Sequence, residues 1–254
     1  MGGAPPMSAV PSTFPFTRRL AQLVPLSPDD VGLLSELQSN TRTVQRHRDI
    51  ITEGRSYDSL FIIMEGNAIR YRILHDGRRQ IINMVLPGDV VGILGSFTDS
   101  SLYSTKALTD MLIAAVPIAR LNTMIGTHPR LITKILWSLT CESTIYAEHL
   151  IDLGRRSALE RVAHFLLELL TRLQTVGLAQ DHSYKIPLTQ ELLGDALGLS
   201  IPHINRVLRR LREDGLVVVE DQRVTIHDID ALSQLADFEP GYLSRFSGAE
   251  LLAG

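Results

Sequence analysis

Six side chains of the types that bind nucleic acids are concentrated between residues 203 and 212. They are His203, Asn205, Arg206, Arg209, Arg210 and Arg212, and no acidic residue lies among them. Arginine can donate two parallel hydrogen bonds to guanine, and asparagine or histidine can reach a base edge or a phosphate. A run of charged residues on one helix is, by itself, more often a solvent-exposed face without a binding function. Whether this run binds nucleic acid therefore depends on the structure that the surrounding segment forms.

The segment 185–228 predicts two short helices followed by a β-hairpin. Thr189 is placed to cap the first helix, Gly198 to end it, and Ser200 to cap the second. The apolar face of the second helix consists of Ile204, Val207, Leu208 and Leu211. This face directs the six polar residues to solvent. Two helices joined by a short turn and followed by a hairpin indicate a winged helix-turn-helix, whose second helix enters the major groove of DNA.

The basic face is a local feature of an otherwise slightly acidic chain. The 254 residues include 25 Lys and Arg against 28 Asp and Glu, for a formal net charge of −3. Residues 156–230 contain nine basic and eleven acidic side chains. Affinity for DNA should therefore come from a focused patch, doubled by dimerisation, rather than from a general cationic field.

Residues 40–120 predict short strands separated by glycine turns. Ile69, Tyr71 and Ile73 alternate with polar residues, and Asp76 with Gly77 supplies a tight hairpin turn before the return strand. Further glycine turns follow at intervals of roughly ten residues, as in all-β folds with many short strands. This spacing favours an antiparallel β-roll of the jelly-roll type over a parallel sheet with crossover helices.

Residues 128–153 predict one long helix with an apolar stripe. The stripe repeats every seven residues at Ile132, Leu139, Tyr146 and Leu153, flanked by Leu136 and Leu150, and Glu142 and Ser143 interrupt it. Such a stripe favours pairing with the same helix of a second copy, although an ordinary core helix against the roll is the alternative. A second amphipathic helix follows over 158–173, and Gly154 with Arg155 and Arg156 indicates a hinge between the two.

Composition limits the other function classes. Cys141, the single cysteine, cannot form an internal disulfide or supply the thiolates of a zinc or iron–sulfur site, and is expected to be a packing residue. The longest uncharged apolar run, at 111–119, is far shorter than the roughly 18 residues of a membrane helix, so a cytoplasmic location is expected. No glycine-rich phosphate loop, G-x-S-x-G elbow or paired-histidine motif occurs. We therefore expect no enzyme, no catalytic residue, no metal and no cofactor.

In this order, the roll, the long helix and the winged helix resemble the CRP/FNR family of bacterial transcription factors, named after the cyclic AMP receptor protein and the fumarate–nitrate reductase regulator. The most specific carriers of the resemblance are PGDVVGILGSF at 87–97 and LTQELLGDALGLSIPHINRVLRRL at 188–211. The resemblance implies an α+β fold with an N-terminal antiparallel, cyclic-nucleotide-binding-like β-roll, a long dimerisation helix and a C-terminal winged helix-turn-helix.

The same resemblance implies a division of the chain and roles for its residues. The expected parts are a loose arm (1–15), the sensory β-roll (16–125), the dimerisation helix and hinge (126–154), the DNA-binding domain (155–232) and a tail (233–254). Arg206 would be the principal base-reading residue, assisted by His203 and Asn205. Phosphate contacts are implied for Thr189, Gln190, Ser200 and Arg209.

The resemblance also places an effector pocket, if the protein has one, at Gly92, Ile93, Leu94, Gly95, Tyr103, Ser104 and Tyr146. Members that bind cyclic AMP carry a glutamate at the position of Ile93, an arginine at that of Tyr103 and a Thr-Ser pair at that of Tyr146 and Ala147. Without that arginine, Lys106 is the one obvious basic residue nearby in the sequence, and an unpaired buried phosphate is costly. We therefore expect no binding of cyclic AMP.

The sequence gives little support for an iron–sulfur cluster or a haem as a sensory cofactor. One cysteine cannot hold an iron–sulfur cluster. A haem ligand could come from His47, His75 or His149, but none of them has a spacing that singles it out.

The expected function is that of a homodimeric, sequence-specific transcriptional regulator that binds an inverted repeat with half-sites about one helical turn apart. Its expected partners are double-stranded DNA and a second copy, with RNA polymerase and an unidentified small-molecule effector as further candidates, and no membrane. Two alternatives stay open: a ligand-binding module whose helix-turn-helix contacts proteins, and a regulator that does use a cyclic nucleotide.

Overall fold

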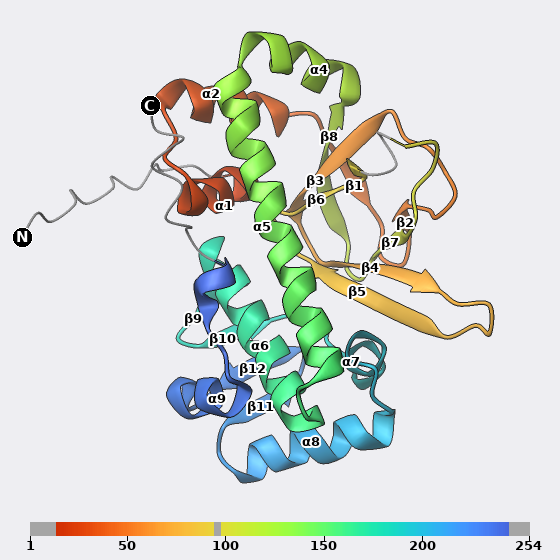
Figure 1. The fold of residues 1–254 in the computed structure, drawn as a ribbon, viewed down its shortest axis with the longest axis vertical. Coiled ribbons are helices and arrows are strands. Elements are labelled where there is room, and N and C mark those ends of the chain that lie inside the picture. The colour runs from red at the N-terminus through yellow and green to blue at the C-terminus, as the bar shows by residue number, and fades with distance from the viewer. Residues whose placement is uncertain (1–13, 94–97, 244–254) are drawn as a thin grey trace, which may run out of the picture.

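The computed structural model describes residues 14–93 and 98–243. Of the residues singled out above, Leu94 and Gly95 lie outside these ranges, as do most of the expected arm and the end of the tail. Within the described ranges, none of the helices combines the length and apolarity needed to cross a bilayer. The predicted order of β-roll, long helix and helix-turn-helix is confirmed (Figure 1).

The β-roll consists of two four-stranded sheets in which every neighbouring pair is antiparallel. One sheet has the order β1 (Thr41–Val44), β8 (Met111–Pro117), β3 (Ser59–Glu65) and β6 (Val90–Val91). The other has the order β2 (Asp49–Ile51), β7 (Ser104–Ala107), β4 (Ala68–Ile73) and β5 (Arg79–Val85). The predicted hairpin joins β4 to β5, and Gly77 adopts the left-handed φ of +84° that this turn requires.

Among the described residues, three short helices flank the roll: α1 (Pro15–Leu23), α2 (Pro28–Leu37) and α4 (Ile118–Thr127). They were not expected from the sequence. The start of α2 does carry a clear signal, because Ser27 and Asp30 form a reciprocal capping box before and inside its first turn.

The long helix α5 spans Pro129–Gly154, in agreement with the helix expected over 128–153. After the short connection 155–157, α6 (Ala158–Thr175) turns back beside the lower half of α5 (Figure 1). Ser157 and Glu160 cap its first turn reciprocally.

The C-terminal part contains the helix-turn-helix and a small sheet. Its helices are α7 (Gln190–Leu197), α8 (Ile201–Glu213), α9 (Ile229–Ala236) and the 3-10 helix η1 (Pro240–Leu243). The predicted two-stranded wing is part of a four-stranded sheet with the order β11 (Val217–Glu220), β12 (Arg223–Ile226), β10 (Ser183–Lys185) and β9 (Ala179–Gln180).

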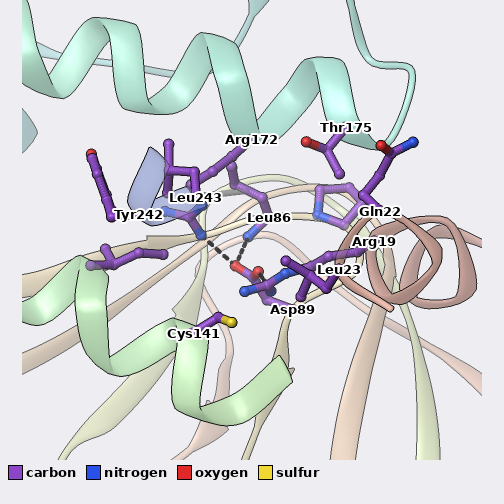
Figure 2. Close-up of a pocket in the computed structure, with 12 residues that line it drawn as sticks. Arg19, Gln22, Leu23, Leu86, Asp89, Cys141, Arg172, Thr175, Tyr242 and Leu243 are labelled. Carbon is purple, nitrogen blue, oxygen red and sulfur yellow. Dashed lines mark hydrogen bonds and ion pairs between the residues drawn. The ribbon is translucent and has the colours of Figure 1, made fainter. Parts of the chain in front are cut away.

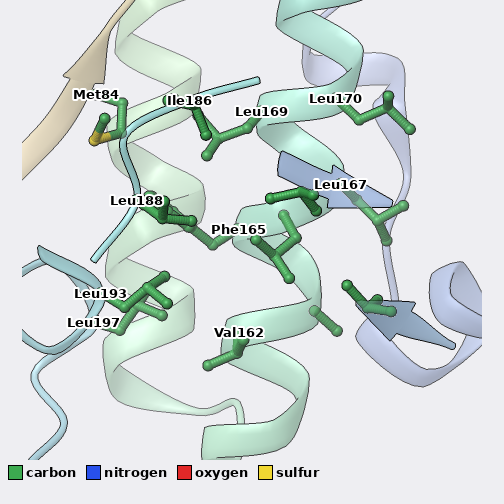
Figure 3. Close-up of a cluster of buried hydrophobic side chains, with 14 of the residues drawn as sticks. Met84, Val162, Phe165, Leu167, Leu169, Leu170, Ile186, Leu188, Leu193 and Leu197 are labelled. Carbon is green, nitrogen blue, oxygen red and sulfur yellow. The ribbon is translucent and has the colours of Figure 1, made fainter. Parts of the chain in front are cut away.

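One apolar core joins the roll to the DNA-binding part. Phe165, Leu166 and Leu169 of α6 belong to a buried cluster that also contains Ile81 and Met84 of β5. Figure 3 shows Met84 facing α6, with the helix-turn-helix side chains Leu193 and Leu197 packed in the same cluster. The two parts therefore share buried side chains as well as a covalent connection.

Candidate DNA-binding surface and sensory pocket

Helix α8 separates an apolar face from a basic one. Ile204, Val207 and Leu211 are buried, at the three- and four-residue spacing that keeps side chains on one side of a helix. Pro202 lies in the first turn, where its missing N–H costs no helical hydrogen bond. Ser200 occupies the N-cap position, but the prediction that it caps the helix is wrong, because its side chain accepts no hydrogen bond from the first turn.

The opposite face of α8 presents the predicted polar residues. Asn205, Arg206 and Arg209 are exposed, and His203 is half-buried. Arg210 is neutralised within its own helix, since its Nε lies 2.5 Å from Oδ2 of Asp214. Three other guanidinium groups, those of Arg206, Arg209 and Arg212, have no carboxylate partner within the described part of the chain. These three are available to an external anion.

Helix α7 and the turn after it fix the position of α8. The Thr189 hydroxyl accepts a hydrogen bond of 3.1 Å from the N–H of Leu192 and so caps α7 as predicted. Gly198 ends the helix in the left-handed conformation, at φ +64°. A Cβ atom on Gly194 would lie 2.6 Å from the carbonyl oxygen of Leu199, so only glycine permits this approach of helix and turn.

Thr189, Gln190 and Ser200 are exposed at the first turns of α7 and α8. The backbone N–H groups of a helix N-terminus, with the positive end of its dipole, favour a phosphate. Thr189, Gln190 and Ser200, three of the four residues implied in phosphate contact, thus lie at the starts of the two helices, and the fourth, Arg209, lies in the middle of α8.

Contacts that were not anticipated hold α7 against the roll. Arg79 of β5 lies 2.7 Å from the carboxylate of Asp195 and 3.1 Å from that of Glu191. Gln80 donates a hydrogen bond of 3.2 Å to the carbonyl of Ala196. The end of the β4–β5 hairpin and the first helix of the helix-turn-helix are thus joined by polar contacts as well as by the shared core.

A buried arginine that was not singled out from the sequence lies among the residues expected to form an effector pocket. Arg70 of β4 is 4% exposed, and its Nη1 lies 3.0 Å from Oε1 of Glu142 on α5. Tyr103 and Tyr146 flank the guanidinium, with ring centroids 4.9 and 6.0 Å from its Cζ. The hydroxyl of Tyr146 contacts Arg70 and donates a hydrogen bond of 3.1 Å to Glu142. Two of the expected pocket residues, Tyr103 and Tyr146, therefore meet around an internal ion pair.

The other described pocket residues make separate contacts. Ile93 packs with the apolar residues between the roll and α5, and Gly92 has a left-handed φ of +91° close to Ile51. The Ser104 hydroxyl accepts a hydrogen bond from the N–H of Glu53. Lys106, the basic residue favoured from the sequence, does not serve this pocket, because its amine lies over the ring of Tyr71.

A second buried charge network connects the roll, α5 and α6. Glu168 is fully buried and accepts contacts from Nε2 of His149 at 2.8 Å and Nη1 of Arg172 at 3.0 Å. Arg172 in turn lies 2.7 Å from Asp89, which also contacts Arg19 (Figure 2). The cost of burying the charges of Glu168, Arg172 and Asp89 is offset by their pairing, and removing one partner would leave a buried charge uncompensated.

The pairing of Glu168 with His149 shifts the pKa values of both groups. Burial raises the pKa of Glu168, but the attraction and hydrogen bonds of His149 and Arg172 outweigh it and hold the pKa at about 2. Burial lowers the pKa of His149, yet its contacts with Glu168 outweigh burial and raise it above 6.5. Both ring nitrogens of His149 are engaged, since Nδ1 lies 3.1 Å from the carbonyl of Ile82. This engagement disfavours His149 as a haem ligand, while His47 and His75 are exposed on the roll.

Two sequence families match the chain in the order of its two halves. A cyclic nucleotide-binding domain matches residues 41–128, and a Crp-like helix-turn-helix domain matches residues 160–235. The chain belongs to the CRP/FNR family. As a CRP/FNR-type transcriptional regulator, it combines a helix-turn-helix DNA-binding domain with a cyclic-nucleotide-binding-like sensory domain.

Named relatives agree with this assignment. Electron transport regulator A of Shewanella oneidensis is 28% identical over 211 residues, which cover 83% of this chain and 84% of the relative. The fumarate and nitrate reduction regulatory protein of Escherichia coli is 27% identical over 213 residues, which cover 83% and 84%. Among solved structures, FixK2 of Bradyrhizobium japonicum superposes with a TM-score of 0.69 at 27% identity, covering 77% of this chain and 96% of FixK2.

Proposed function

We propose that this CRP/FNR-type regulator acts in the cytoplasm as a homodimer on an inverted-repeat DNA site, with one α8 in each of two major grooves. The observation that carries the proposal is the exposed face of α8, on which Arg206, Arg209 and Arg212 have no carboxylate partner among the described residues. In this proposal Arg206 reads a base pair, assisted by His203 and Asn205. The phosphate contacts come from Arg209 and from Thr189, Gln190 and Ser200 at the helix starts.

The surface of α5 supports the dimer. Leu136, Leu150 and Leu153 are 57%, 71% and 43% exposed, and Ile132, Leu139 and Tyr146 on the same stripe are half-buried. The three exposed leucines leave apolar surface of α5 uncovered within the described part of the chain, which is the expected state of a coiled-coil face without its partner. Ile132 and Tyr146 also contact their own chain, at the core and at Arg70. Glu142, which interrupts the stripe in the sequence, lies one turn before Tyr146, and both side chains face Arg70 of the roll.

We further propose that the sensory domain does not bind cyclic AMP. The one buried guanidinium at the described part of the pocket, that of Arg70, is already neutralised by Glu142. A cyclic phosphate would bring a second negative charge to a pair that is balanced without it, and would have to displace both tyrosines. In this proposal the sensory domain binds an effector other than cyclic AMP or no effector at all. The DNA-bound protein contacts RNA polymerase.

Selection of bound fragments from a random DNA pool tests the proposal. With purified protein at about 0.15 M salt and no added ligand, we expect a palindromic site with half-sites about one helical turn apart. Recovery of no common sequence would contradict sequence-specific binding. Isothermal titration calorimetry that detects micromolar affinity for cyclic AMP would contradict the effector assignment.

The selected site then tests Arg206. Arg206→Ala should lose on the order of 1–3 kcal/mol of binding free energy per half-site on the selected DNA site. On a DNA site in which the base pair read by Arg206 has been replaced, the same substitution should cost little. Arg210→Ala is the matched control, because Arg210 is on the same helix but is paired with Asp214. Equal losses on every DNA sequence would show that Arg206 holds a phosphate and does not read a base.

A further inference from the structure

After α9, the chain does not leave the fold but returns to the junction of α5 and α6. It turns at Asp237, which has a left-handed φ of +48°, and continues through Phe238 into η1. In Figure 1 this is the dark blue segment that rises beside α6. We call residues 237–243 the C-terminal strap. It lies within the tail that was expected over 233–254.

The strap makes polar contacts with α5 and with the connection that follows it. The Thr144 hydroxyl of α5 shares its proton between two carbonyl oxygens, that of Cys141 at 2.6 Å and that of Tyr242 in the strap at 2.9 Å. Arg156, in the connection between α5 and α6, donates one of 3.3 Å to the carbonyl of Asp237. Arg156 is itself held by Asp152, at 2.8 Å. The strap therefore attaches to α5 at a point well before the hinge and again at the hinge.

The strap also packs against α6 through aromatic side chains. The ring of Tyr242 is stacked on the fully buried ring of His164, with centroids 5.9 Å apart and planes 8° apart. Phe238, 8% exposed, meets the same histidine edge-on at 5.1 Å. These three rings form a cluster, since Phe238 and Tyr242 are also in edge-to-face contact at 6.1 Å.

These contacts connect α5 and α6 in addition to the covalent connection at 155–157 and the pair of His149 with Glu168. A change in the angle between the helices would have to break the Thr144–Tyr242 hydrogen bond or separate Tyr242 from His164. Packing within the winged domain alone does not account for the strap, because Tyr242 and Leu243 reach Cys141 and Ile145 of α5 around a shared cavity (Figure 2).

We propose that the C-terminal strap fixes the angle between α5 and α6 and thereby sets the orientation in which the DNA-binding domain is presented. The proposal rests on the proposed function, in which α5 carries the dimer interface and α6 leads to the helix-turn-helix. Residues 237–243 then determine the distance between the two α8 helices of a dimer without touching DNA.

The test compares Tyr242→Ala with Tyr242→Phe. The phenol oxygen of Tyr242 is buried without a hydrogen-bond partner among the described residues, so Tyr242→Phe should keep the stacking and behave as the unmodified chain. Spin labels at Thr133→Cys on α5 and Arg212→Cys on α8, in a Cys141→Ala background and diluted with unlabelled protein, report the angle within one chain. We expect Tyr242→Ala to broaden the distance distribution between the labels, and Tyr242→Phe to leave it narrow.

DNA binding provides the second measurement. Tyr242→Ala should weaken binding to the full inverted repeat at least tenfold, while its affinity for a single half-site stays within twofold of that of Tyr242→Phe. Unchanged label distances in Tyr242→Ala would overturn the proposal, and so would equal losses on full sites and half-sites, which would indicate a damaged winged domain. The label distances do not depend on DNA, so a chain that binds no specific site contradicts the proposed function without deciding the role of the strap.

Discussion

Leu150→Ala should weaken the homodimer more than any other single truncation on α5. Leu150 has the most exposed side chain of the stripe, at 71%. Burial of a whole leucine side chain stabilises by about 1.5–3 kcal/mol, so burial of this exposed fraction contributes about 1–2 kcal/mol per chain. In a twofold-symmetric interface both copies of Leu150 are truncated, so the dimer should lose about 2–4 kcal/mol of association free energy. Since about 1.4 kcal/mol is tenfold, the dimer Kd should rise by about 30- to 1000-fold.

Sedimentation equilibrium over a range of protein concentrations measures this change directly. Leu178→Ala is the matched control, because Leu178 is 51% exposed but lies after α6, away from the stripe. It should leave the dimer Kd unchanged. If Leu150→Ala and Leu178→Ala have the same dimer Kd as the unmodified chain, the stripe on α5 is not the interface, and the argument from its exposure is wrong.

Two further predictions concern the caps and the charge network. Thr189→Ala should lower the free energy of unfolding by about 1 kcal/mol, and Ser200→Ala should barely change it, because only Thr189 caps its helix; both should weaken DNA binding. Urea unfolding and binding titrations of the two variants check this. The free energy of unfolding should fall as pH rises through the raised folded-state pKa of His149. Protonated His149 stabilises the fold fully below its ordinary pKa of 6.5, and this contribution is lost as pH rises through the folded-state value. Glu168, held at a pKa of about 2, contributes at the other end and loses its contribution as pH falls from 4.5 toward 2. Urea unfolding between pH 6 and 9 should show this alkaline loss, and His149→Gln should remove it; an identical slope in His149→Gln would contradict the assignment.

The helix-turn-helix could be predicted from the sequence because its signals are local. Thr189, Gly198 and the apolar positions of α8 each act within a few residues, through a cap, a left-handed turn and a helical period. Ser200 shows the limit of such reasoning, because a residue can occupy the N-cap position without its hydroxyl reaching the first turn.

The buried ion pairs could not be predicted because they join residues far apart in the sequence. Arg70 alternates with Ile69 and Tyr71, which suggests an outward-facing residue, but both faces of β4 are covered, one by α5 and one by the cluster around α6. Glu142 likewise appeared to be a defect in the stripe of α5. Only the packing of α5 against the roll shows that the two charges meet.

The core that β5 shares with α6 and the helix-turn-helix bears on protein engineering. Transplanting residues 155–232 onto a different sensor would uncover the apolar side chains that now meet Ile81 and Met84, and would strip Asp195 of its arginine. A chimaera would therefore need a recipient hairpin that carries the same apolar pair and the same guanidinium. Because the two halves share this core, substitutions on one side constrain which residues the other side can accept.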